Sequence, residues 1–124
     1  MIACCLDKEE IEKFLGIANS INIECIVEIH NEDDLKKIEG SKIDIIGINN
    51  RNLKTFEVSI ETSFRLRTLL PEEAVVISES GIKSREDIKR LKKMGFNGVL
   101  IGEVLLRSPS PGEKLRELLK GVND

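Results

Sequence analysis

The chain has 124 residues, which is enough for one domain with a substantial hydrophobic core. Hydrophobic residues make up 40% of it and charged residues 33%, a balance typical of a globular domain rather than a disordered chain. A net charge of −3 and an aromatic content of only 3% argue against nucleic-acid and anionic-membrane partners.

The first predicted strand, Ile2–Leu6, carries two of the three cysteines. Cys4, Cys5 and Cys25 show no regular spacing and have apolar neighbours, so we expect reduced, buried, structural thiols in a cytoplasmic protein. We expect no metal site, because neighbouring strand residues point to opposite faces and His30 is the only histidine. The sequence has no signal-peptide pattern, and no apolar run approaches the roughly 20 residues of a membrane span.

Short apolar runs and amphipathic charged segments alternate along the rest of the chain. Helices are predicted to begin near the polar residues Asp7, Asn31, Ser59, Ser84 and Ser110. Asp7 with Glu10, and Ser84 with Asp87, have the spacing of capping boxes. The runs between the helices are rich in β-branched residues and predict four further strands: Glu24–Ile29, Ile43–Ile48, Ala74–Ser78 and Gly98–Ile101.

Five strand–helix units with short connections predict a single α/β domain, residues 1–124, with a parallel sheet. Two architectures fit this order. One is a complete, doubly wound, five-stranded sheet, and the other is the C-terminal portion, about strands 4–8, of a (β/α)8 TIM barrel, which typically needs about 250 residues. Side-chain alternation favours the partial barrel, because one face of each strand turns polar only at its C-terminal tip.

Polar side chains stand at the ends of three predicted strands. Glu28, Asn49 and Glu79 each follow an apolar run, and parallel strands bring such ends to one edge of the sheet. We expect Glu28 and Glu79 to lie at equivalent heights. Two carboxylates converging in a partly dry site take unequal pKa values, which suits acid–base catalysis. The sequence therefore predicts a catalytic site at this edge.

An anion site is predicted beside it. Ser80-Gly81 follows one strand and Gly102 follows the next, at positions where backbone N–H groups can approach an anion. TIM barrels commonly bind phosphate with the loops after strands seven and eight. Arg51 could add a charge-assisted contact.

The motifs VEIHNEDDL, IIGINNRNLKTFEV, ISESGI and VLIGEVLLRS resemble, in order, successive motifs of the indole-3-glycerol-phosphate synthase family. MIACCL is similar to the fourth strand of the family barrel, so the resemblance covers the C-terminal half. It implies a lyase of tryptophan biosynthesis that uses neither metal nor cofactor. The phosphorylated substrate, carboxyphenylamino-deoxyribulose phosphate, would be closed to indole-3-glycerol phosphate with loss of carbon dioxide and water.

The resemblance also implies roles for individual residues. Glu28 corresponds to a general base, Asn49 to a group that orients substrate, and Glu79 to a supporting carboxylate. Leu100 matches an apolar pocket position. Only the N–H of Glu103 should serve the phosphate, because its carboxylate would repel it. The substrate- and phosphate-side positions are Arg51, Ser80, Gly81, Gly102 and Glu103.

The lysines that the family carries on strands one and three have no counterpart in this sequence. We therefore expect no turnover by the chain alone, and either self-association or pairing with the missing half-barrel. Two alternatives remain open: a non-catalytic, self-associating half-barrel, or a sibling phosphate-binding barrel enzyme such as phosphoribosylanthranilate isomerase.

Overall fold

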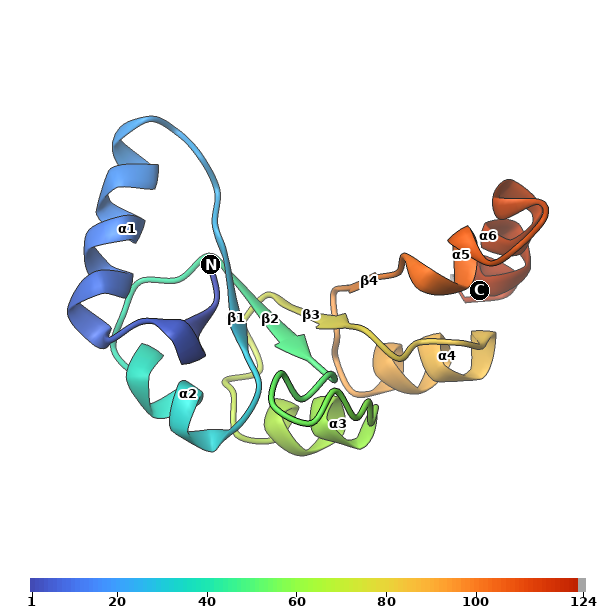
Figure 1. Cartoon of the computed structure of the whole chain (residues 1–124), viewed down its shortest axis with the longest axis horizontal. Helices are drawn as coiled ribbons and strands as arrows, with labels where there is room; N and C mark the ends of the chain where they lie inside the picture. The colour runs from blue at the N-terminus through green and yellow to red at the C-terminus, as the bar shows by residue number, and fades with distance from the viewer. Residues whose placement is uncertain (123–124) are drawn as a thin grey trace.

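The computed structural model describes residues 1–122, which form a parallel sheet with helices along one side (Figure 1). The four strands lie in the order β1-β2-β3-β4. Each strand is therefore a neighbour of the next one along the chain, without the reversal of direction that defines a doubly wound sheet. This is the arrangement of an arc of a (β/α)8 barrel. The strands are β1 (Ile26–Ile29), β2 (Ile45–Asn49), β3 (Val76–Glu79) and β4 (Gly98–Leu100).

The helices are α1 (Lys8–Ser20), α2 (Glu32–Ile38), α3 (Glu61–Arg67), α4 (Arg85–Lys93), α5 (Glu103–Leu106) and α6 (Pro111–Leu119). Asp7 and Ser84 complete the predicted capping boxes of α1 and α4, and Asn31 caps α2. Ser59 does not cap α3, which begins after Ile60. The short helix α5 was not predicted. Within residues 1–122, no helix has the length and apolar character needed to cross a membrane.

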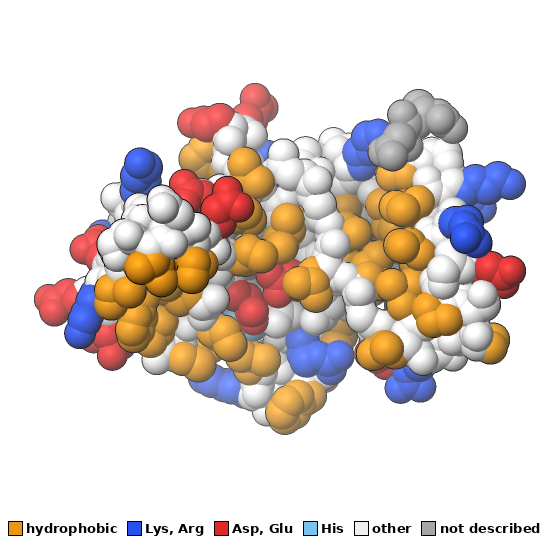
Figure 2. Space-filling model, turned by 90° about the horizontal axis from the view of Figure 1, so that it is seen from above, with side chains coloured by type: hydrophobic (Ala, Val, Ile, Leu, Met, Phe, Trp, Pro, Cys, Tyr) orange, Lys and Arg blue, Asp and Glu red, His pale blue; other side chains and the backbone are white. Residues whose placement is uncertain are grey.

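The two faces of the sheet differ in burial. Val27, Ile48 and Val76 point to the helix side and are fully buried. On the opposite side Val75 is 43% exposed and Leu100 51% exposed, because no helix of residues 1–122 covers that side. Figure 2 looks onto this open side and shows hydrophobic side chains with acidic ones among them. In a closed barrel this side would be the packed interior.

The predicted strand Ile2–Leu6 is wrong beyond its first residue. Ile2 forms an isolated parallel bridge with Glu28, and the backbone N–H of Glu28 donates to the Met1 carbonyl at 2.7 Å. The chain then turns into a short 3-10 helix, η1 (Ala3–Cys5). Pairing on one side only leaves this segment without the second neighbour that an interior strand has.

The predicted burial of the cysteines is also wrong. Cys4 and Cys5 are exposed, and Cys25 is half-buried, although all three are free thiols as expected. Cys4 and Cys5 lie in η1 rather than in a strand, so their side chains are not covered by the sheet and its helices.

Candidate active site

The carboxyl ends of β1 and β2 bring Glu28 and Asn49 into direct contact. The Asn49 amide nitrogen Nδ2 donates to Glu28 Oε1 at 2.7 Å. Its oxygen Oδ1 accepts the backbone N–H of Arg51 at 2.9 Å. The amide is thus fixed from both ends, and it links the carboxylate of Glu28 to the loop that carries Arg51.

Glu28 and Glu79 do not lie at equivalent heights, contrary to the sequence-based expectation. In the sheet register Glu28 pairs with Gly47, whereas Glu79 pairs with Asn49, two residues further along β2. The two carboxylates still approach each other because Gly47 has no side chain. A Cβ atom at Gly47 would lie 2.1 Å from Glu79 Oε1 and 2.9 Å from Ile26 Cγ2. The glycine therefore leaves the space that the Glu79 side chain occupies.

Glu79 is only 7% exposed although it carries a carboxyl group. Burial raises the pKa of this carboxyl above its ordinary value of 4.5, and the neighbouring charge of Glu28 raises it further. A carboxyl with a raised pKa next to a second carboxylate is an arrangement suited to holding or passing a proton. The acid–base role predicted from the two strand ends stays a prediction, with which this geometry is compatible.

His30 is the site residue that the sequence reasoning missed. Its imidazole Nε2 lies 3.0 Å from Glu28 Oε1. Its Nδ1 lies 3.3 Å from Asp34 Oδ2, and its backbone N–H donates to the same oxygen at 2.9 Å. The sequence did contain a signal for this contact. His30 follows Glu28 by two residues, and side chains two residues apart in a strand point to the same face.

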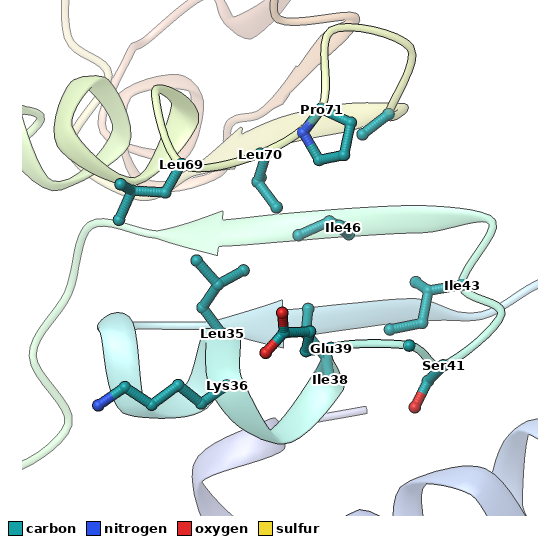
Figure 3. A pocket seen from close by; sticks show the side chains of 12 residues that line it. Leu35, Lys36, Ile38, Glu39, Ser41, Ile43, Ile46, Leu69, Leu70 and Pro71 are labelled. Atoms are coloured by element: carbon teal, nitrogen blue, oxygen red, sulfur yellow. The ribbon is translucent and has the colours of Figure 1, made fainter.

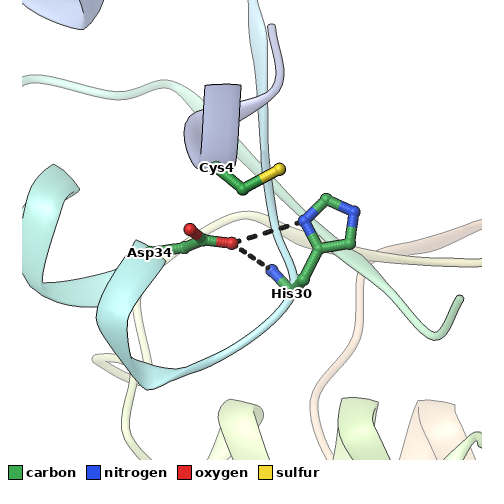
Figure 4. A group of neighbouring side chains, drawn as sticks. All are labelled: Cys4, His30 and Asp34. Carbon is green, nitrogen blue, oxygen red and sulfur yellow. Dashed lines mark hydrogen bonds and ion pairs between the residues drawn. The ribbon is translucent and has the colours of Figure 1, made fainter. Parts of the chain in front are cut away.

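Cys4, His30 and Asp34 gather with their candidate ligand atoms within 4.8 Å of one another (Figure 4). Asp34 Oδ2 already contacts the backbone nitrogen and the ring Nδ1 of His30. Although the Cys4 side chain is exposed, partial desolvation and the Cys5 sulfur, 3.8 Å away, raise the pKa of its thiol, and a protonated thiol is a poor metal ligand. These contacts describe a polar network around His30, and we assign no metal to it.

Next to the carboxylates, a cavity of about 440 Å³ opens at the ends of β3 and β4. Ser80 and Gly81 have positive φ angles of 66° and 73°. A Cβ atom at Gly81 would also lie 2.5 Å from Val58 Cγ1, so the turn and the close approach both require glycine. All six predicted substrate-side residues line this cavity: Arg51, Ser80, Gly81, Leu100, Gly102 and Glu103.

The side chain of Glu103 lies at the cavity, where its carboxylate contacts two arginine side chains. Its carboxylate is 3.6 Å from Arg51 Nη2 and 3.0 Å from Arg107 Nε. At 64% exposure it is largely in solvent, where such pairs are weak. Arg107 and Lys83 also line the cavity and were not predicted. Together these cations give the lining of the cavity a basic character.

Asn50 is a buried structural residue rather than a simple turn residue. It is 2% exposed, donates to the Ser80 carbonyl at 2.9 Å and to Ser78 Oγ at 3.0 Å, and accepts the Ser63 N–H. Its amide therefore ties the Ser80-Gly81 turn to β3 and to α3. This bonding holds the Ser80-Gly81 turn in place.

A further hollow, of about 450 Å³, lies at the other end of β2 (Figure 3). Its lining is mainly apolar, with Leu35 and Ile38 from α2 facing Leu70 and Pro71. It is slightly larger than the cavity beside the carboxylates, but the amino-terminal end of a barrel strand is the end that serves stability rather than catalysis. We place the candidate active site at the carboxyl ends.

Comparison with known proteins agrees with the resemblance in the motifs. The family model described as indole-3-glycerol phosphate synthase matches residues 1–118. The relative named indole-3-glycerol phosphate synthase in Alkaliphilus metalliredigens is 47% identical over 124 residues, covering 100% of this chain and 48% of the relative. The one in Bacteroides thetaiotaomicron is 47% identical, covering 98% and 46% respectively. This chain therefore spans about half the length of these relatives.

Solved structures with low sequence identity share the fold. A chain of the Amycolatopsis orientalis BexX/CysO complex superposes with a TM-score of 0.67 at 13% identity, over 94% of this chain and 48% of that one. The YdjI aldolase from Escherichia coli K12 gives a TM-score of 0.58 at 20% identity, over 98% and 54%. In both comparisons this chain matches about half of the length of the other chain.

Proposed function

Because this chain belongs to the indole-3-glycerol phosphate synthase family, we propose that it supplies the C-terminal half of a cytoplasmic carboxy-lyase of tryptophan biosynthesis. The substrate would be carboxyphenylamino-deoxyribulose phosphate and the product indole-3-glycerol phosphate. The observation that carries this proposal is the contact of Glu28 with Asn49 beside the buried Glu79, at the strand ends where barrel enzymes hold their active sites.

In this proposal Glu28 is the general base. Asn49 holds Glu28 Oε1 and orients the substrate beside it. Glu79, whose pKa is raised by burial, supports proton transfer within the pair. A positioned acid or base of this kind contributes about 10²–10⁴-fold to a rate.

The substrate phosphate would occupy the cavity lined by the Ser80-Gly81 turn and Gly102. Backbone N–H groups at Gly81 and Glu103 would bind its oxygens. Arg51 would leave its long contact with Glu103 for the stronger, charge-assisted contact with the phosphate. Leu100 would form part of the apolar wall against the aromatic ring.

The proposed partner is the half-barrel that the relatives carry in addition to the matched region. None of the lysines in this sequence stands at the C-terminal tip of an apolar strand, so the chain offers no general acid of the kind the family uses. The open side of the sheet, with Leu100 51% exposed, is the surface such a half would cover.

The test is turnover of the phosphorylated substrate by the chain alone and after addition of the N-terminal half of the Alkaliphilus metalliredigens relative. We expect product only from the mixture, and a loss of about 10²–10⁴-fold in kcat when the mixture contains Glu28→Gln. A Glu24→Gln chain is the matched control, because Glu24 is an exposed carboxylate that precedes β1. A mixture that folds but makes no product would support the non-catalytic half-barrel instead.

A further inference from the structure

The imidazole of His30 stands between two carboxylates that belong to different elements. Its Nε2 faces Glu28 on β1 at 3.0 Å, and its Nδ1 faces Asp34 on α2 at 3.3 Å. The His30 side chain is 7% exposed and that of Asp34 is 3% exposed. Contacts between charged and polar groups are strongest where water is excluded in this way.

Asp34 is itself held in place. Its Oδ2 accepts the backbone N–H of His30 at 2.9 Å, and its own backbone N–H donates to Asn31 Oδ1 at 2.9 Å. The carboxylate is therefore tied to the end of β1 while its backbone is tied to the cap of α2. Asp34 can fix the orientation of the His30 ring without being near the substrate cavity.

The contact between His30 and Glu28 is close but incompletely aligned. Among the side chains of residues 1–122, His30 Nε2 is the single buried nitrogen or oxygen with no aligned hydrogen-bond partner. A buried polar nitrogen without a partner is costly, and the Glu28 carboxylate is the acceptor within reach when Nε2 carries the proton.

Two groups thus converge on one oxygen of Glu28. Asn49 Nδ2 donates to Oε1 at 2.7 Å, and His30 Nε2 lies 3.0 Å from the same atom. Neither of these two contacts involves Oε2, the oxygen through which a general base would take a proton. From these contacts we propose that His30, oriented by Asp34, is a positioning residue that directs Oε2 of Glu28 toward the substrate.

This inference rests on the proposed function, because it assigns work to Glu28 in the lyase reaction. It adds a residue that acts through Glu28 and does not touch the substrate. Loss of a positioning group displaces the reacting atom, and a displacement of about 1 Å can cost on the order of 100-fold in rate.

The contact itself can be tested on the chain without any activity. His30 is the only histidine, so ¹⁵N-histidine labelling gives one Nδ1 and one Nε2 resonance. We expect Glu28→Gln to shift the Nε2 resonance and Asp34→Asn to shift the Nδ1 resonance. Glu24→Gln removes an exposed carboxylate before the same strand and should leave both in place. An Nε2 resonance unmoved in a folded Glu28→Gln chain would overturn the proposal.

Catalysis in the mixture with the N-terminal half tests the positioning role. We expect His30→Ala to lower kcat by roughly 10- to 100-fold with little change in KM. His30→Gln, whose amide N–H can still donate to Glu28, should recover part of the loss. Unchanged kcat in His30→Ala would refute the role of His30. If the mixture with Glu28→Gln also turns over normally, the proposed role of Glu28 in the lyase reaction is wrong. The NMR experiment then still shows whether His30 contacts Glu28.

Discussion

A single glycine allows two carboxylates from different strands to meet. Because a Cβ atom at Gly47 would lie 2.1 Å from Glu79 Oε1, Gly47→Ala must displace Glu79 or β2. We expect urea denaturation to show a loss of about 1–3 kcal/mol, as for other overpacked positions. Gly16→Ala is the control, because no described atom lies within 4 Å of that Cβ and alanine favours helix α1 by about 1 kcal/mol. Equal effects of the two changes would contradict this account.

The buried carboxyl of Glu79 makes stability depend on pH. Its pKa is raised by folding, so its contribution to stability is complete below about pH 4.5 and is lost as pH rises through the folded-state value. Because glutamine does not ionise, Glu79→Gln removes this loss of stability at higher pH. We expect urea midpoints of the variant and the original chain to agree at low pH and to diverge toward neutrality, with the variant more stable. Glu73→Gln, an exposed carboxylate before β3, should show no such divergence.

At the scale of the element, capping explains where α4 begins. Ser84 Oγ accepts the Asp87 N–H at 3.2 Å, and the Asp87 carboxylate accepts the Ser84 N–H in return. We expect Ser84→Ala to cost about 1 kcal/mol in urea denaturation. Ser110 precedes α6 without a side-chain capping bond among the described residues, so Ser110→Ala is the matched control and should cost less. A larger loss for Ser110→Ala would refute the capping argument.

At the scale of the whole molecule, both ends of the arc expose apolar side chains. Phe14 and Ile17 on α1 are 43% and 50% exposed, and Leu106 on α5 is 84% exposed. Apolar surface of this kind favours association, so we expect sedimentation to depend on concentration. Leu106→Asp should weaken the association, whereas Lys120→Glu changes an exposed charge without removing apolar surface. A monomer at all concentrations would exclude self-association of this chain.

Local patterns in the sequence predicted most of the elements. The β-branched runs marked the four strands β1–β4 to within two residues of their ends, and the capping boxes marked the starts of α1 and α4. These features depend on neighbours within a few residues along the chain, which the sequence displays directly.

By itself, then, the sequence determined the strand–helix alternation, the family resemblance and the identity of the polar residues at the strand ends. Only the tertiary structure decided that Ile2–Leu6 is mostly a 3-10 turn. It also decided that Glu28 pairs with Gly47 while Glu79 pairs with Asn49, so that the two carboxylates lie at different heights. It also decided that His30 reaches back to Glu28. Strand pairing, register and side-chain contacts across the sheet depend on residues far apart in the chain, and no local pattern records how those residues meet.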